Sequence, residues 1–262
     1  MDVVFGTGSC RPRGNRLTTF VEKGFREVAC HQPSWRWYTP FVNAARLKIA
    51  PSCYFLPDGW SMEGIRVDGR LEEFLDELYE QGRAHDALQS DRLRRWRNLE
   101  PDTARLLAVV ARALSPRRSL ELGTSNGYST IWLADAVCSG GGSLVSIEID
   151  TARAALARKN FARAGVEGVV ELRVEDAGRT LSASADAEWE FIFLDAERPA
   201  YSGYWPDLVR VLAPRALLVI DNVISHASEL TEFRQLVAAD ERVMETLCPI
   251  GAGVLFVVRV GG

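Results

Sequence analysis

The sequence predicts an α/β protein with a doubly wound, mostly parallel sheet of seven strands that ends in an antiparallel hairpin. From residue 119 onward, short apolar runs alternate with helix-like runs, and this alternation is typical of a parallel sheet with helices on both faces. Two β-rich stretches, 244–248 and 253–260, close the chain. Because the loop between them is too short for a parallel crossover, these two strands must pair antiparallel.

Two amphipathic helices are expected before the sheet begins. The first covers 67–81 and gathers leucine and aromatic side chains on one face, as the helical period requires. The second covers 101–114 and has Pro101 in its first turn, where proline is well tolerated. The other strands are expected at 119–122, 143–148, 169–173, 190–194 and 216–220, with helices at 127–138, 151–164, 203–212 and 228–239.

Residues 1–61 are expected to form an extension that precedes a main domain at 62–262. They show neither helical nor strand periodicity, and so long an irregular stretch is unusual inside a compact domain. We expect an appendage that adds little to the fold, either disordered or lying upstream of a working start at Met62. Its aromatic content favours the opposite interpretation, a lid packed over the acceptor site. These aromatic residues are Trp35, Trp37, Tyr38, Phe41 and Tyr54.

Composition excludes several classes of partner. A net charge of −4 gives no reason to expect nucleic acid or an anionic membrane, and no run approaches the roughly 18 apolar residues of a membrane span. Five cysteines without a CxxC pair argue against a disulfide framework or a zinc site and favour the cytoplasm. The basic run at 92–97 is interpreted as a solvated helix face or as a lip on the substrate side.

The stretch 119–150 predicts a nucleoside-containing cofactor. It holds a strand, a glycine-bearing turn from Gly123 to Gly127, a helix, and a second strand that ends in Glu148. A tight turn lets a ligand approach the backbone, and a carboxylate at the tip of the second strand accepts hydrogen bonds from a ribose diol. An ordinary βαβ crossover without a ligand is the alternative.

Two residues indicate which nucleoside is bound. A dinucleotide fingerprint needs glycine where this turn has Ser125, because the pyrophosphate requires that space. The preceding carboxylate, Glu121, would repel a pyrophosphate but suits a cofactor that carries a positive charge or an amino group. S-adenosylmethionine has both, so it is the cofactor that this pattern favours over a nicotinamide dinucleotide.

Two further strands end in side chains that suit a metal ion. Asp195 follows the strand at 190–194, and Asp221 with Asn222 follows the strand at 216–220. Ligands bind outside the carboxyl ends of the strands in open parallel sheets. Carboxylate and amide oxygens are hard ligands that match Mg²⁺ or another divalent cation. The alternative is that the two aspartates only cap the helices that follow them.

Residues 62–262, about three quarters of the chain, resemble the metal-dependent O-methyltransferases, the group that includes catechol and caffeoyl-CoA O-methyltransferases. The segments that carry the resemblance are 97–101, 120–134 (LELGTSNGYSTIWLA), 145–150 (VSIEID), 191–201 (FIFLDAERPAY), 217–223 (LLVIDNV) and 247–258. The resemblance implies a Rossmann-like methyltransferase sheet. It also implies a small aromatic acceptor with adjacent hydroxyls, and it leaves a homodimer open.

The resemblance also implies roles for individual residues. Those expected to border the cofactor are Asn98, Leu99, Glu121 at the methionine amino group, Gly123, Ser125, Tyr128, Ser129, Glu148 at the ribose, Asp176 and Ala177 at the adenine, and Asp195. Those expected to hold the divalent metal are Asp195, Asp221 and Asn222.

The chain departs from the family at the expected general base. Family members commonly place a lysine three residues after the first metal aspartate, and here that position is Arg198. A guanidinium stays protonated, so Arg198 can stabilise a phenolate but cannot take its proton. Either the metal alone makes the phenolate, or another group is the base, and His226 is the histidine nearest the expected site. The catalytic group is therefore expected to be Asp195, Arg198 and His226, with a cofactor-binding protein that has lost turnover as the alternative.

Overall fold

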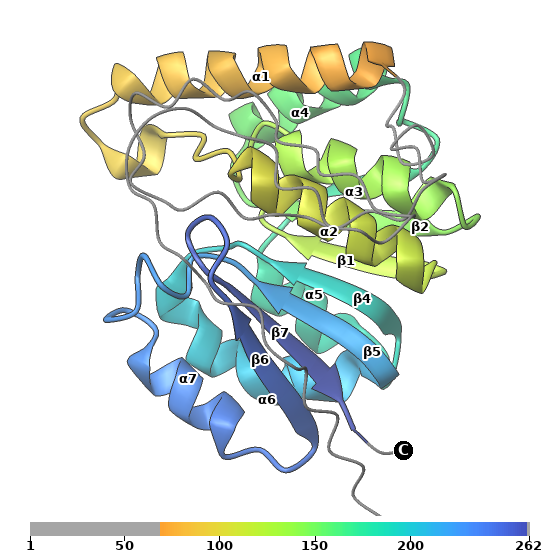
Figure 1. The fold of residues 1–262 in the computed structure, drawn as a ribbon, viewed down its shortest axis with the longest axis vertical. Helices are drawn as coiled ribbons and strands as arrows, with labels where there is room; N and C mark the ends of the chain where they lie inside the picture. Colours follow the sequence, from red (N-terminus) through yellow and green to blue (C-terminus); the bar gives the residue numbers. More distant parts are fainter. Residues whose placement is uncertain (1–68, 261–262) are drawn as a thin grey trace, which may run out of the picture. The chain divides into compact units, whose positions relative to one another are not determined.

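The computed structural model describes residues 69–260. The predictions for residues 1–61, including the start at Met62 and the aromatic lid, lie outside the described residues. Within 69–260, the prediction of a doubly wound seven-stranded α/β sheet with a C-terminal hairpin is confirmed (Figure 1). The strands are β1 Arg118–Leu122, β2 Ser143–Glu148, β3 Val170–Val174, β4 Trp189–Leu194, β5 Leu212–Ile220, β6 Val243–Cys248 and β7 Val254–Arg259.

The strand order is β3-β2-β1-β4-β5-β7-β6. The first five strands in this order pair in parallel, and β7 pairs antiparallel with both β5 and β6. The central strands are mostly buried on both faces, as expected for parallel strands covered by helices on both sides. Within β4, Phe191 and Phe193 pack on one side of the sheet, and Ile192 and Leu194 pack on the other.

Helices cover both faces of the sheet (Figure 1). Helices α1 to α4 contribute to the core on one face, and α5 to α7 contribute to the core on the other. None of the helices between residues 69 and 260 is long and apolar enough to cross a membrane. The helices are α1 Gly69–Ala87, α2 Pro101–Leu114, α3 Tyr128–Cys138, α4 Thr151–Ala164, α5 Ala177–Ala183, α6 Tyr201–Val211 and α7 Thr231–Ala238, with short 3-10 turns η2 Arg92–Arg94 and η3 Arg198–Ala200.

The sequence pattern missed one helix and misplaced several boundaries, among them the end of α1, which lies at Ala87 instead of 81. Helix α5 was not predicted, because it has only seven residues and its start is fixed by the cap that Asp176 provides to the Arg179 amide. Strand β5 begins at Leu212 instead of 216, since Leu212 already pairs with Trp189 of β4, ahead of a register shift. Helix α7 begins at Thr231 instead of 228, because the residues after Asn222 form consecutive turns.

The ends of the central strands are tied to one another at the edge of the sheet. Gly123 donates its backbone N–H to the Ile147 carbonyl, and Asp195 donates to the Leu122 carbonyl. Gly123 has φ of +110°, and a Cβ built there would lie 2.2 Å from the carbonyl oxygen of Asp195. Only glycine therefore fits at the point where the β1 turn passes the end of β4.

Gly123→Ala should destabilise the protein because the added methyl group clashes with the Asp195 backbone in a φ region that alanine disfavours. We expect the free energy of unfolding to fall by about 2–4 kcal/mol, measured by urea denaturation. Gly168→Ala is the matched control, since nothing lies within 4 Å of a Cβ built there, and it should change stability by less than about 0.5 kcal/mol. Equal stability of the two variants would contradict the close approach.

Candidate active site

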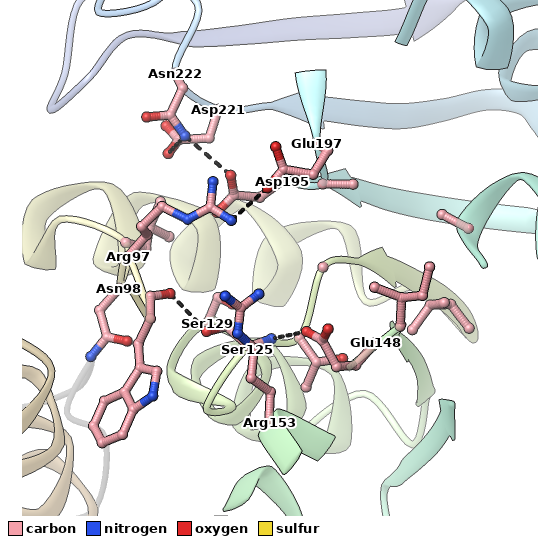
Figure 2. A pocket seen from close by; sticks show the side chains of 18 of the residues that line it. Arg97, Asn98, Ser125, Ser129, Glu148, Arg153, Asp195, Glu197, Asp221 and Asn222 are labelled. Atoms are coloured by element: carbon pink, nitrogen blue, oxygen red, sulfur yellow. Dashed lines mark hydrogen bonds and ion pairs between the residues drawn. The ribbon is translucent and has the colours of Figure 1, made fainter. Parts of the chain in front are cut away.

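A cavity of about 390 Å³ opens at the carboxyl ends of the parallel strands (Figure 2). This volume lies in the range of small-molecule sites. With the exception of Glu121, every residue predicted for the site lines this cavity, so the structure brings the two predicted halves together. These residues are Asn98, Leu99, Gly123, Ser125, Tyr128, Ser129, Glu148, Asp176, Ala177, Asp195, Arg198, Asp221, Asn222 and His226.

The predicted ribose ligand, Glu148, is held by backbone amides at the end of β2. One carboxylate oxygen accepts from the Ser125 N–H at 2.8 Å, and the other accepts from the Asp150 N–H at 2.8 Å. Ser125 has φ of +51°, which turns its amide toward Glu148. A carboxylate has about four acceptor positions, so the oxygens of Glu148 keep capacity for further donors from a ligand.

Glu121 lies beneath the cavity and does not line it. Its carboxylate is fully buried and accepts hydrogen bonds from the hydroxyls of Ser129 at 2.6 Å, Thr130 at 2.5 Å and Ser146 at 2.6 Å. Burial raises the pKa of Glu121 above its usual range. The predicted contact with a methionine amino group stays a prediction. Glu121 is connected to the cavity wall through Ser129, and through Ser146, whose hydroxyl contacts that of Thr124.

The residues predicted at the adenine lie at the start of α5. Asp176 caps this helix, since its carboxylate accepts from the Arg179 N–H at 3.1 Å, and Ala177 is the first helical residue. Tyr204 from α6 joins them in the cavity wall. Burial and the charge of Asp176 raise the pKa of Tyr204, so its hydroxyl stays protonated at neutral pH.

The predicted metal ligands converge at the opposite end of the cavity (Figure 2). The side-chain nitrogen of Asn222 lies 3.1 Å from one oxygen of Asp195 and 2.9 Å from one oxygen of Asp221. The other oxygen of Asp221, Oδ1, is buried without a hydrogen-bond partner. Among residues 69–260, no group of three or more His, Cys, Asp and Glu side chains is arranged to hold a metal ion. The cluster described here has two carboxylates, and the Asn222 amide is its third side chain.

The positive charges near the two aspartates, Arg97 and Arg198, do not offset the effect of burial on their pKa values. Burial and the charge of Asp221 raise the pKa of Asp195 well above its usual range, and burial raises the pKa of Asp221 to about 6. A divalent cation would supply both the missing charge and a partner for the orphaned oxygen. The donor set therefore fits a hard cation such as Mg²⁺, and metal binding stays a prediction.

Arg198 and His226 lie in the cavity wall near this cluster. Arg198 is 4% exposed, and its Nε donates to Glu229 at 2.9 Å. The His226 Nδ1 lies 2.8 Å from the Ser225 hydroxyl, and its backbone N–H donates to the Asn222 carbonyl at 3.1 Å. Burial and the positive charge of Arg198 lower the pKa of His226, which favours the neutral imidazole.

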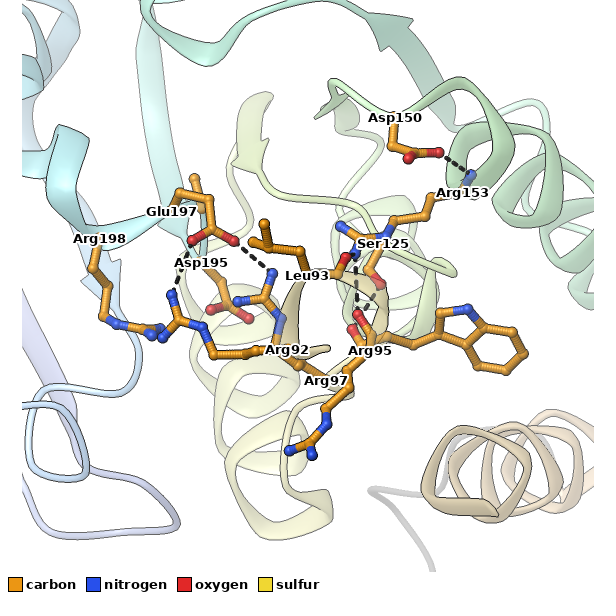
Figure 3. Close-up of polar contacts among 12 residues, drawn as sticks. Arg92, Leu93, Arg95, Arg97, Ser125, Asp150, Arg153, Asp195, Glu197 and Arg198 are labelled. Carbon is orange, nitrogen blue, oxygen red and sulfur yellow. Dashed lines mark hydrogen bonds and ion pairs between the residues drawn. The ribbon is translucent and has the colours of Figure 1, made fainter. Parts of the chain in front are cut away.

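Sequence analysis left two interpretations open for the basic run at 92–97. Four side chains of the basic run, Arg92, Arg95, Trp96 and Arg97, line the cavity, so of its two interpretations the structure favours the lip. The signal was the aromatic residue among the arginines, but its meaning depended on distant partners. Figure 3 shows that Glu197 lies between Arg97 and Arg92, at 2.7 and 3.3 Å from their guanidinium nitrogens.

Comparison with known proteins agrees with the fold. The sequence profile described as O-methyltransferase matches residues 72–260. A catechol O-methyltransferase from Niastella koreensis is 36% identical over 138 residues, which cover 52% of this chain and 62% of that protein. A catechol O-methyltransferase from Mycobacterium tuberculosis is 37% identical over 128 residues, covering 49% of this chain and 58% of that protein. The alignments thus span about 60% of the length of these relatives.

A solved structure extends the similarity to the arrangement of the elements. The O-methyltransferase from Bacillus cereus, solved in complex with SAH, has a TM-score of 0.60 and 27% identity, covering 74% of this chain and 92% of that one. Fold and cavity define a doubly wound α/β protein with a ligand site at its strand ends. The chain belongs to the O-methyltransferase family, whose profile spans most of the described residues.

Metal-free protein should show the cost of burying Asp221. The folded-state pKa of about 6 exceeds the ordinary value of 3.8, so as pH rises the unfolded chain releases this proton first and the folded state loses stability. Asp221→Asn should therefore exceed the wild type in unfolding free energy by about 1–3 kcal/mol at pH 8, and this advantage should disappear near pH 4. Urea denaturation of chelator-treated protein at several pH values measures it.

Asp240→Asn is the control of opposite sign for this measurement. The hydrogen bond from Arg242 lowers the pKa of Asp240, so its carboxylate stabilises the fold at high pH and the variant should be less stable at pH 8 than at pH 4, relative to wild type. An Asp221→Asn protein that is less stable than wild type at pH 8 without metal would contradict the charge deficit.

Proposed function

We propose that the protein transfers the methyl group of S-adenosylmethionine to a hydroxyl of a small aromatic acceptor that carries two adjacent hydroxyls. One observation carries the proposal. The carboxylate fitted to a ribose, Glu148, and the oxygen cluster of Asp195, Asp221 and Asn222 line the same cavity. The similarity to catechol O-methyltransferases supports the acceptor class, and the similarity to a structure solved with SAH supports the cofactor.

The cofactor half of the cavity would be organised by the turn between β1 and α3. Glu148 would accept hydrogen bonds from the ribose hydroxyls, with its orientation already fixed by the Ser125 and Asp150 amides. Ser129 would face the methionine end, and its hydroxyl is directed to the buried Glu121. Fixed groups of this kind contribute by positioning, since correct placement of two substrates can supply about 7–11 kcal/mol of a transfer barrier.

The acceptor half would depend on Asp195, Asp221 and Asn222, which would hold a divalent cation. When bound, such a cation lowers the pKa of a coordinated hydroxyl and orients the two oxygens of a diol. The positive charge of Arg198, held in place by Glu229 at 2.9 Å, would stabilise a phenolate but not accept its proton. His226 lies in the same wall and is our candidate for the base.

Two further properties belong to the same proposal. We infer that the protein acts in the cytoplasm on a free small molecule, given its five cysteines without CxxC pairs and its net charge of −4. A homodimer is compatible with this activity.

A cofactor-binding protein without turnover is the second candidate, and Arg198 is the observation that favours it. The nitrogen of this side chain that bonds Glu229 is not available to an acceptor, and no lysine stands in its place. The two candidates differ in one measurable respect, because both bind the cofactor but only the enzyme transfers its methyl group.

Methyl transfer from radiolabelled S-adenosylmethionine to a panel of catechols should be detectable with Mg²⁺ and should fall at least about tenfold with EDTA. Resorcinol, whose hydroxyls are not adjacent, is the matched control acceptor and should stay unlabelled. Calorimetric titration with S-adenosylhomocysteine and with NAD accompanies the assay. Binding of the former without any labelled catechol would favour the second candidate, and binding of NAD alone would refute both.

Glu148→Gln should weaken binding of S-adenosylhomocysteine by about tenfold to a hundredfold, because hydrogen bonds to a charged acceptor contribute about 1.5–3 kcal/mol. Calorimetric titration measures the affinity without turnover. The control is Glu171→Gln on β3, an exposed carboxylate paired with Arg173 outside the cavity, which should bind as the wild type does. Unchanged affinity of Glu148→Gln would refute its assignment to the ribose.

A further inference from the structure

Residues 92–98, which we call the cavity segment, form part of the wall of the site but have little regular structure of their own. Only the short turn η2, Arg92–Arg94, interrupts an otherwise irregular path toward α2. Neighbouring side chains therefore have to hold the backbone of this segment, since no ladder of helix or strand hydrogen bonds does so.

The first anchor comes from the end of α1. The carboxylate of Asp86 accepts from the backbone N–H groups of Trp96 at 2.7 Å and Arg97 at 2.8 Å. The ring of His85 stacks on Trp96 with centroids 3.9 Å apart. These contacts fix the middle of the cavity segment and hold Arg97 at φ of +54°, a conformation that a residue with a side chain rarely adopts.

The second anchor comes from the elements that surround Glu148 (Figure 3). The Ser125 hydroxyl donates to the Trp96 carbonyl at 2.7 Å. The guanidinium of Arg153, in the first turn of α4, donates to the carbonyls of Leu93 and Arg95, the latter at 3.2 Å. Among residues 69–260, Arg153 forms no ion pair, so its charged side chain is directed to the backbone of the cavity segment.

The other end of the cavity segment reaches the predicted metal site. Arg97 bonds Glu197, two residues after Asp195, at 2.7 Å, and Figure 2 shows Arg97 directed toward Asp195 and Glu197. The positive charge of Arg97 also acts on Asp195, opposing the rise in the pKa of Asp195 that burial causes. One irregular segment therefore connects the surroundings of Glu148 with those of Asp195.

We propose that Arg153 is a positioning residue of this site. By bridging two carbonyl groups of the cavity segment it fixes the backbone that places Arg97 beside Asp195 and Glu197. One terminal nitrogen of the guanidinium donates to both carbonyls, and the planar guanidinium holds its donors in a fixed geometry, whereas a lysine ammonium is a point charge on a flexible stem. The effect on methyl transfer rests on the function proposed above, but the effect on the cavity segment does not.

Hydrogen–deuterium exchange of the full-length protein tests the proposal. In Arg153→Gln, amide exchange in peptides covering 92–98 should accelerate by about tenfold, because two charge-assisted hydrogen bonds are lost. Arg153→Lys should recover part of the protection. Arg158→Gln, five residues further along α4, is the matched control, since this arginine bonds the Leu172 carbonyl outside the cavity, and exchange at 92–98 should match the wild type.

Two results would overturn the proposal. Unchanged exchange at 92–98 in Arg153→Gln would show that Arg153 does not hold the segment. Equal acceleration in peptides from β2 and α4 would show a loss of fold instead of a local release. If wild type transfers methyl groups, KM for the acceptor should rise about tenfold in Arg153→Gln. If wild type does not, the proposed function fails while the exchange result still decides the role of Arg153.

Discussion

Four carboxylates stand at the ends of parallel strands along one edge of the sheet, and much of the surrounding structure serves to hold them there. Burying a charged group costs several kcal/mol unless it is paired or hydrogen-bonded. Glu121 accepts hydrogen bonds from three hydroxyls, and Glu148 accepts them from two backbone amides. The protein itself therefore supplies hydrogen-bond donors to both carboxylates on the cofactor side. Asp195 and Asp221 face each other with one oxygen left without a partner. This difference favours a cation at the Asp195 end of the cavity and a ligand with hydrogen-bond donors at the Glu148 end.

The positive charges near Asp195 lie around the rim of the cavity and do not fully balance the charge of the Asp195 carboxylate. Arg97 and Arg92 share Glu197, and Arg92 also lies 3.5 Å from Glu229, which binds Arg198. Each arginine is thus paired with a glutamate. These pairs partly cancel the positive charge that acts on the two aspartates. Because rim pairs are partly exposed, their individual contribution to stability is about 0–1 kcal/mol. Their main effect is geometric, since they hold the wall that closes the acceptor end.

The strands and most helices could be predicted because their signals are local. Apolar runs that end in Glu148, Asp195 or Asp221 indicate both a buried strand and a polar group at its tip, and the parallel topology then brings these tips together. Glu121 comes one residue before the end of β1, and its side chain points under α3, where the hydroxyls of Ser129 and Thr130 bond it, so its contact with a cofactor stays a prediction. For residues 92–97 the sequence could not decide between a lip and a solvated helix face, because the groups that hold this segment come from α1, the β1 turn and α4. Nothing in RLRRWR specifies those partners.

Arg198 also affects the protonation of His226. A lysine there could release a proton and act as a base, whereas the guanidinium stays charged under all working conditions. That permanent charge, together with burial, lowers the pKa of His226, so the imidazole is neutral and has a free lone pair at neutral pH. Its Nδ1 contacts Ser225, which leaves the opposite ring nitrogen for a ligand when Nδ1 carries the proton. The same substitution that removes one candidate base from the site therefore keeps a second one in its basic form.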